Sequence, residues 1–283
     1  MADDTITSLD LLEVEALRGR QTRLTGRLWA GTWPKLAGLA VALAAWQAVV
    51  WSGWKPEYAL PGPAAVGTQL LHDLTSARLW HGMATTGRRA VIGFTIAVAV
   101  GLAIGLAVAR TRFLRAAVGS LITALQTMPS IAWFPLAILM FQLTERAILF
   151  VVVLGAAPSI ANGVISGVDY IPPLLLRAGS NLGARGLDLY RHVIAPAALP
   201  AIVAGLKQGW AFAWRSLMAG ELLVVIAAET SLGAQLSYAR ELSDAPWLIS
   251  TMIVILLVGL VVDGLFGSVD RMIRTRWGIA EDR

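Results

Sequence analysis

Three charged side chains interrupt one long apolar stretch of this sequence, AIVAGLKQGWAFAWRSLMAGELLVVIAA, which runs over residues 201–228. They are Lys207, Arg215 and Glu221. A charged side chain near the centre of a membrane costs at least ~2.5–3.5 kcal/mol, so we expect it to face protein or water rather than lipid. Arg215 and Glu221 are six residues apart, which places them about 120° out of alignment on one helix. Each is therefore expected to meet a partner from another element or another chain.

The chemistry of these side chains leaves alternatives open. Arg215 either attracts an anionic substrate, such as a sulfonate or a carboxylate, or forms a structural ion pair. Glu221 either makes a structural polar contact inside a helix bundle or belongs to a translocation path. Trp210 and Trp214 are four residues apart on the helix face that carries Lys207, and they either line a cavity or pack against other side chains.

A second candidate segment, LQTMPSIAWFPL, covers residues 125–136. Pro129 and Pro135 leave backbone carbonyl groups without a helical partner at membrane depth, which is tolerated mainly where the backbone is buried in protein or lines a cavity. Gln126 and Met128 add a polar and a soft group beside Pro129. This segment is expected either to form part of a translocation path or to be a simple kink.

A third candidate segment, residues 172–196, carries charge where its neighbours are apolar. Read as a helix, it places a polar stripe at spacings of 4, 4, 3 and 4 residues, formed by Arg177, Asn181, Arg185, Asp188 and His192. Gly183 and Gly186 either weaken this helix or divide it into two short helices. The pattern is typical both of a connector helix that rests on lipid headgroups and of a docking helix that offers one face to a cytoplasmic partner.

The composition indicates what must position these segments. The chain has 283 residues, of which 57% are hydrophobic and only 14% are charged, whereas soluble domains carry about 25% charged residues. A spanning helix needs about 20 apolar residues. The sequence therefore predicts an all-α, polytopic membrane protein with six transmembrane helices, at Leu36–Trp54, Ala90–Ala109, Ala116–Thr144 with a kink or unwound turn near TMPSIAWFP, Ala147–Val168, Pro200–Ala228 and Ala245–Val262.

The basic residues predict the orientation. With the N-terminus inside, the inner segments hold fifteen Lys and Arg residues and the outer segments hold six, as the positive-inside rule requires. Both termini are then cytoplasmic, and the net charge of +5 reflects topology rather than nucleic-acid binding. Residues 1–34 are expected to form a cytoplasmic arm, 35–270 the membrane domain with its inner loop 172–196, and 271–283 a cytoplasmic tail.

The sequence offers no catalytic set. It has no cysteine, and none of its three histidines belongs to an HExxH pair that could bind a metal. It has neither GxSxG nor GxxxxGK[ST], so we expect no catalytic residue, no metal site, no cofactor and no ATP-binding loop in this chain. An ion channel or a secondary carrier is a rival interpretation, because neither would need an ATPase.

The third segment resembles the cytoplasmic EAA loop of binding-protein-dependent ABC-transporter permeases, the transmembrane subunits of type I importers. That motif reads Glu-Ala-Ala, three residues, Gly, nine residues, Ile-x-Leu-Pro. Ala178, Gly183, Val193, Ala195 and Pro196 stand at matching places in GSNLGARGLDLYRHVIAPAALP and the residues before it, whereas Arg177 replaces the usual Glu and Gly179 the second Ala. The stretches LPGPAAV, TMPSIAWFPLAILMF, HVIAPAALPAIVAGLKQGWAFAWRSLMAGELL and RTRWG are similar to the sulfonate/taurine/nitrate branch.

This resemblance implies the type I importer permease fold in a bacterial inner membrane. It implies four partners besides the lipid bilayer: a second permease copy, two ATPase subunits that carry ATP and Mg²⁺, and a periplasmic or lipid-anchored binding protein. Import, rather than export, also rests on the resemblance. Aliphatic sulfonates and taurine are the first expected substrates, and nitrate, bicarbonate, aromatic acids and pyrimidine precursors are the alternatives.

Two sets of residues are expected to carry the function. The set expected to dock the ATPase and fix the exit angle of the loop is Ala178, Gly183, Arg185, Asp188, Arg191 and Pro196. The set expected to line the translocation path or contact substrate is Gln126, Met128, Pro129, Trp210, Trp214, Arg215 and Glu221.

Overall fold

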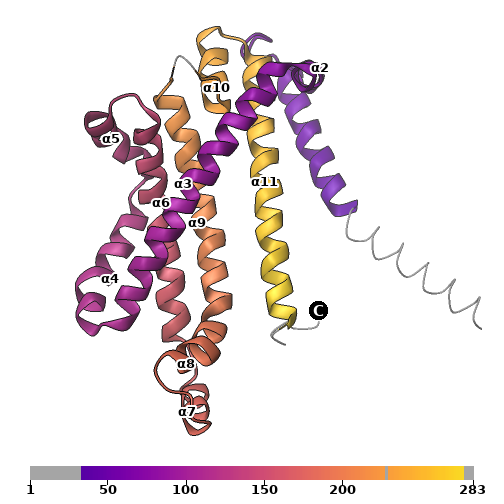
Figure 1. Ribbon diagram of the computed structural model, residues 1–283. Coiled ribbons are helices and arrows are strands. Elements are labelled where there is room, and N and C mark those ends of the chain that lie inside the picture. Colours follow the sequence, from indigo (N-terminus) through magenta and orange to yellow (C-terminus); the bar gives the residue numbers. More distant parts are fainter. Residues whose placement is uncertain (1–32, 227–228, 277–283) are drawn as a thin grey trace, which may run out of the picture. The chain divides into compact units, whose positions relative to one another are not determined.

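The computed structural model describes residues 33–226 and 229–276 (Figure 1). The described residues divide into two compact units, one that ends at Val66 and one that begins at Gly67. The described part of the first unit contains the helix Trp33–Trp51, which is long and apolar enough to cross a membrane. The predicted cytoplasmic arm 1–34 lies almost wholly outside the described residues.

Helices make up the second unit, and its described residues contain no strand. Helix α2 (Pro63–Thr75) runs into it from the first unit. The elements that follow are α3 (Ala77–Arg110), α4 (Arg112–Thr127), a 3₁₀ turn (Ser130–Trp133), α5 (Phe134–Phe141), α6 (Glu145–Asp169), α7 (Pro173–Asn181), α8 (Leu187–Leu189), a π-helical turn (Tyr190–Ile194), α9 (Ala195–Leu223), α10 (Leu232–Glu241) and α11 (Ala245–Arg276).

The predicted spans correspond to these helices. Five helices of the described residues are long and apolar enough to cross a membrane, and the total rises to six when the bent pair Phe113–Thr127 and Ser130–Phe141 counts as one span. The two helices of that pair meet at a bend of 104°, which is compatible with a broken span or with a re-entrant loop. Met128 and Pro129 are both extended at the bend, because the residue before a proline is disfavoured in the helical region and proline has no N–H to continue the helix.

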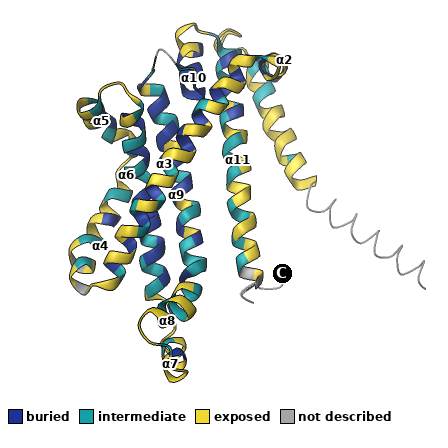
Figure 2. Ribbon diagram, viewed as in Figure 1, coloured by how far each residue is buried: buried dark blue, intermediate teal, exposed yellow. Residues whose placement is uncertain are grey.

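The core of the second unit lies around α6. In the most apolar stretch of α6, 61% of the residues are buried, whereas 28% or less are buried in the corresponding stretches of the other candidate spans. Figure 2 shows the buried colour concentrated on α6 and the adjoining face of α9. The two backbones approach closely at Gly163 of α6 and Gly205 of α9, where a Cβ added to Gly163 would lie 2.7 Å from the Cα of Gly205. Small residues allow such close packing of membrane helices.

The remaining short helices lie near the two ends of α9. Helix α10 lies beside one end, and α7 and α8 extend from the other (Figure 1). At the α7 end, an ion pair of 2.7 Å joins Arg115 of α4 to Asp169, the last residue of α6. Helix α9 therefore contains the charged membrane segment and joins it directly to the polar loop 172–196.

Candidate functional site

Two of the three charges on α9 have partners within the chain. The carboxylate of Glu221 accepts a hydrogen bond of 3.0 Å from Nη1 of Arg89 and one of 2.8 Å from Oγ1 of Thr86. The ammonium group of Lys207 lies 3.5 Å from Oδ2 of Asp263 on α11. These contacts come from α3 and α11, as the poor alignment of the charges along α9 leads one to expect.

Arg215 is different, because no carboxylate of the described residues lies within ion-pair distance of it. Its Nε donates to the backbone oxygen of Ala211 at 3.1 Å, and its guanidinium lies 5.1 Å from the ring centroid of Phe212. The residue is exposed on α9. An arginine at membrane depth must find water or an anion, so Arg215 is a candidate contact for a negatively charged ligand.

A pocket of about 270 Å³ borders Arg215 at the sharp bend between α4 and α5. This bend pocket is lined by Gln126, Met128, Pro129 and Ser130, with Phe212 and Arg215 across from them on α9. The Nε2 atom of Gln126 is buried and has no hydrogen-bond acceptor in the described part of the chain. The structure therefore brings four of the predicted path residues (Gln126, Met128, Pro129 and Arg215) to one pocket, although up to 89 positions separate them in the sequence.

A second pocket of about 480 Å³ lies between α9 and α11 and shares Arg215 with the bend pocket. Most of the lining of this α9–α11 pocket is apolar and includes Trp210, Trp214, Met218 and Met252. Its volume falls within the range of about 300–1,000 Å³ that small-molecule sites occupy. Arg215 thus lines both pockets, one with several polar residues in its wall and one that is largely apolar.

The two tryptophans also pack into the core. The rings of Trp210 and Trp214 stack with centroids 6.0 Å apart, and Trp210 meets Phe94 of α3 edge to face at 5.3 Å. Trp210 is only 8% exposed, and it also contacts the ring of Phe266 on α11. The two tryptophans pack with side chains of α3 and α11, and both residues also line the α9–α11 pocket.

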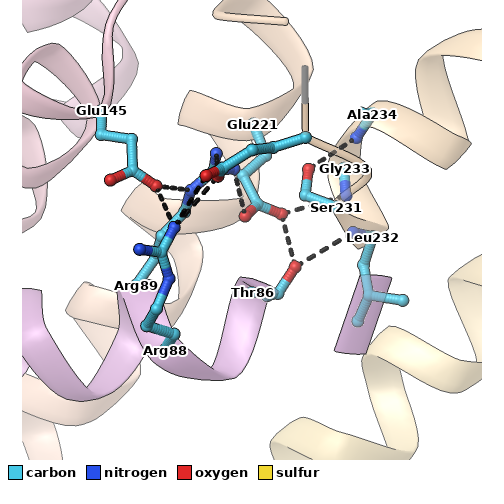
Figure 3. A network of polar contacts seen from close by, with 10 residues as sticks. Thr86, Arg88, Arg89, Glu145, Glu221, Ser231, Leu232, Gly233 and Ala234 are labelled. Carbon is cyan, nitrogen blue, oxygen red and sulfur yellow. Dashed lines mark hydrogen bonds and ion pairs between the residues drawn. The ribbon is translucent and has the colours of Figure 1, made fainter. Parts of the chain in front are cut away.

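Glu221 lines neither pocket and belongs to a polar cluster near the α10 end of the unit (Figure 3). Arg89 is the centre of this cluster, since its guanidinium contacts the carboxylates of Glu145, Glu221 and Glu229 at 2.9, 3.0 and 2.9 Å. Arg88 adds contacts to Glu145 at 2.7 Å and to Glu229 at 3.0 Å. The Glu221 side chain is fully buried and that of Arg89 is 3% exposed, so the two charges meet inside the helix bundle.

The same cluster fixes the beginning of α10. The first N–H groups of a helix have no partner within the helix. Here Leu232 N–H donates to Thr86 Oγ1 at 3.0 Å, Gly233 N–H donates to Glu221 at 3.1 Å, and Ala234 N–H donates to Ser231 Oγ at 3.2 Å. Glu221 thereby ties α3, α9 and α10 together.

Sequence reasoning missed Arg88 and three further charged members of this cluster, Arg89, Glu145 and Glu229. Arg89 entered only as one of the outer basic residues that set the topology. The available signal was position, because each of the three stands within a few residues of the end of a predicted span. Opposite charges at neighbouring span ends can meet at the same membrane surface.

The inner loop 172–196 is divided into two short helices at its glycines. Gly183 and Gly186, with φ of +89° and +56°, separate α7 from α8. Such φ values favour glycine. Five of the six predicted docking residues are exposed on this loop, and the sixth is the half-buried Pro196 at the beginning of α9; the exposed five are Ala178, Gly183, Arg185, Asp188 and Arg191.

The packing inside the loop accounts for Gly179, which stands where the resembled motif has alanine. A Cβ at Gly179 would lie 2.8 Å from Cγ2 of Val193 and 3.1 Å from Cδ1 of Leu189. Glycine therefore lets α7 lie directly against the π-helical turn. Leu182 and Leu187, 89% and 81% exposed, stand on either side of the turn between the helices.

Comparisons with known proteins agree with this architecture. The model of a family described as binding-protein-dependent transport system inner membrane component matches residues 97–275. The riboflavin transport system permease protein RibX of Chloroflexus aurantiacus is 32% identical over 250 residues, which cover 87% of this chain and 91% of RibX. The putative aliphatic sulfonates transport permease protein SsuC of Escherichia coli is 31% identical over 221 residues, covering 78% and 83%.

A solved structure of the MetNI methionine ABC transporter in an inward-facing conformation superposes with a TM-score of 0.60 at 18% identity. The match covers 69% of this chain and 96% of that chain. At this level of identity the likeness concerns the fold alone.

Proposed function

Because this chain belongs to the family of binding-protein-dependent transport system inner membrane components, we propose that it is the permease subunit of an ATP-driven importer for a small organic anion, with aliphatic sulfonates and taurine as the first candidates. The family is one of multi-pass ABC transporter permeases, which are transport subunits and not enzymes. Membership implies an ATPase partner and a substrate-binding partner.

We assign an anionic substrate because the charge of Arg215 has no counter-charge in the described residues. Lys207 and Glu221 are each balanced within the chain, whereas Arg215 borders two pockets without a counter-charge in the described residues. The guanidinium group binds planar or tetrahedral oxyanions with paired hydrogen bonds. Sulfonates and carboxylates present such oxygens. Nitrate, bicarbonate, aromatic acids and pyrimidine precursors are the alternative cargoes of the same class of permease.

In this proposal the loop 172–196 transmits the work of the ATPase. Its exposed glycines, charges and leucines form the docking surface, and Pro196 sets the angle at which the loop enters α9. Helix α9 carries Arg215 about 30 Å from its own beginning at Ala195, where the loop ends, since each helical residue adds about 1.5 Å. Movement of the loop would therefore reach the anion contact through a single continuous helix, as alternating access requires.

The proposal also includes a second copy of the permease and the orientation of both copies in the membrane. Arg215, Gln208 and Ala204 are exposed and lie along one side of α9. A polar stripe at membrane depth is expected to face water or protein, and a second copy of this permease would supply the other wall of a shared path. Both termini and the loop would lie in the cytoplasm of a bacterial cell, beneath the inner membrane, with ATP and Mg²⁺ bound by the ATPase.

Transport by the reconstituted complex tests the proposal. The permease would be purified with its ATPase and binding protein, placed in proteoliposomes, and assayed for uptake of radiolabelled sulfonates with and without ATP. We expect uptake that needs ATP, the ATPase and the binding protein. For Arg215→Ala we expect at least a tenfold loss of substrate-stimulated ATP hydrolysis with an intact complex. Uptake by the permease alone would instead support the channel or carrier alternative.

A further inference from the structure

The side chains around Arg215 divide into a polar set and an apolar set, and the two sets lie in different pockets. Two residues that line the bend pocket have donors without an acceptor in the described residues: Arg215, whose one hydrogen bond there uses Nε, and Gln126, whose amide nitrogen is buried. Ser130 adds a hydroxyl. Donors of this kind are satisfied by a group that only accepts hydrogen bonds, such as an ionised sulfonate or carboxylate.

The α9–α11 pocket offers the opposite chemistry. Its walls are formed largely by indole, thioether and aliphatic side chains from Trp214, Met218, Met252, Ile255 and Leu260. Asp263 also lines it, but the contact of 3.5 Å with Lys207 balances its charge. The charge that this pocket presents without a partner in the described residues is therefore the one on Arg215.

From this arrangement we infer that the permease carries anions with an apolar body, whose head binds Arg215 and Gln126 in the bend pocket while the body occupies the α9–α11 pocket. The inference rests on the proposed function and narrows its substrate class. Nitrate and bicarbonate would satisfy Arg215 but would leave a largely apolar pocket of about 480 Å³ without contacts. Burying apolar surface stabilises a complex by roughly 25 cal/mol per Å², so an alkyl or aryl body adds affinity that an inorganic anion cannot obtain.

Substitutions at Met252 test the site for the apolar body of the ligand separately from the site for its anionic head. Met252 lies on α11, is 51% exposed, and lines the α9–α11 pocket but not the bend pocket. Met252→Trp would fill part of the pocket, and Met252→Ala would widen it. Met140 on α5 is a matched control, since it is 58% exposed and lines neither pocket.

The experiment measures ATP-dependent uptake of methanesulfonate, hexanesulfonate, benzenesulfonate, 2-naphthalenesulfonate and nitrate by the reconstituted complex. Each variant is compared with the parent for the same ligand, so that the preference of the binding protein cancels. For Met252→Trp we expect about a tenfold loss of hexanesulfonate and benzenesulfonate uptake, as steric discrimination in an apolar pocket allows, with methanesulfonate uptake changed less than twofold. For Met252→Ala we expect a higher ratio of naphthalenesulfonate to methanesulfonate uptake. Met140→Trp should change none of the ratios.

The possible outcomes distinguish failure of the apolar-body inference from failure of the proposed function. Equal losses for long and short sulfonates in Met252→Trp, or an unchanged naphthalenesulfonate ratio in Met252→Ala, would overturn the apolar-body inference while leaving an ATP-driven permease in place. Parent complex that takes up nitrate and none of the sulfonates would overturn it in the same way. Absence of ATP-dependent uptake for every ligand would overturn the proposed function and the inference together.

Discussion

Arg89 of α3 and Glu221 of α9 form an ion pair of 3.0 Å whose two side chains are 3% and 0% exposed. Removing one partner of a buried pair leaves an uncompensated charge and costs about 3–5 kcal/mol, whereas replacing both partners with apolar residues costs much less. For Arg89→Met we therefore expect a large drop in the thermal unfolding temperature of the purified complex. The double variant Arg89→Met with Glu221→Leu should recover part of that loss. A double variant less stable than either single variant would contradict this account.

The approach of α6 and α9 at Gly163 predicts a steric limit. Gly163→Ala places a methyl group against the backbone of Gly205, which cannot move without separating the two helices. We expect a loss of about 1–3 kcal/mol, as overpacking typically causes. The matched control is Gly264→Ala on α11, where an added Cβ meets nothing within 4 Å. That substitution should be neutral or slightly stabilising because alanine favours a helix. Thermal unfolding of both variants in the same detergent measures the difference.

The turn between α7 and α8 predicts a specific defect in coupling. Gly183→Arg introduces a bulky side chain at a φ of +89°, in the middle of the proposed docking surface. We expect the permease to fold and insert but to lose most of the ATPase that co-purifies with it. Gly53→Arg is the control, since Gly53 also has a positive φ, +67°, with nothing within 4 Å of an added Cβ, and lies in the other unit. Equal recovery of ATPase in both variants would show that the loop is not the docking surface.

The absence of cysteine from the sequence allows a clean test of topology. Leu182, 89% exposed, directly follows α7, and Leu242, 72% exposed, directly follows α10; these two helices lie at opposite ends of the second unit (Figure 1). With a membrane-impermeant maleimide on intact spheroplasts, we expect labelling of Leu242→Cys and protection of Leu182→Cys. Permeabilised cells should label both variants. The reverse pattern in intact cells would place the loop outside and would rule out its contact with a cytoplasmic ATPase.

Several features of the fold follow from local sequence. The six apolar segments can be found from hydropathy, because every spanning helix must present about 20 lipid-compatible residues. The break at Pro129 follows from the covalent structure of proline and its effect on Met128. The division of the inner loop follows from Gly183 and Gly186, which can adopt positive φ at low cost. In each case a few adjacent residues contain the cause.

The sequence by itself therefore determined the spans, the break in the third span and the position along the chain of the polar loop 172–196. Only the tertiary structure decided which of the charges on α9 has no counter-charge among the described residues. Glu221 meets Arg89, 132 positions away, and Lys207 meets Asp263, while Arg215 meets no acid of the described residues and borders both pockets. The physical reason is that an ion pair depends on the depth and rotation of two packed helices, and these are set by contacts such as that of Gly163 with Gly205 rather than by the residues next to the charge.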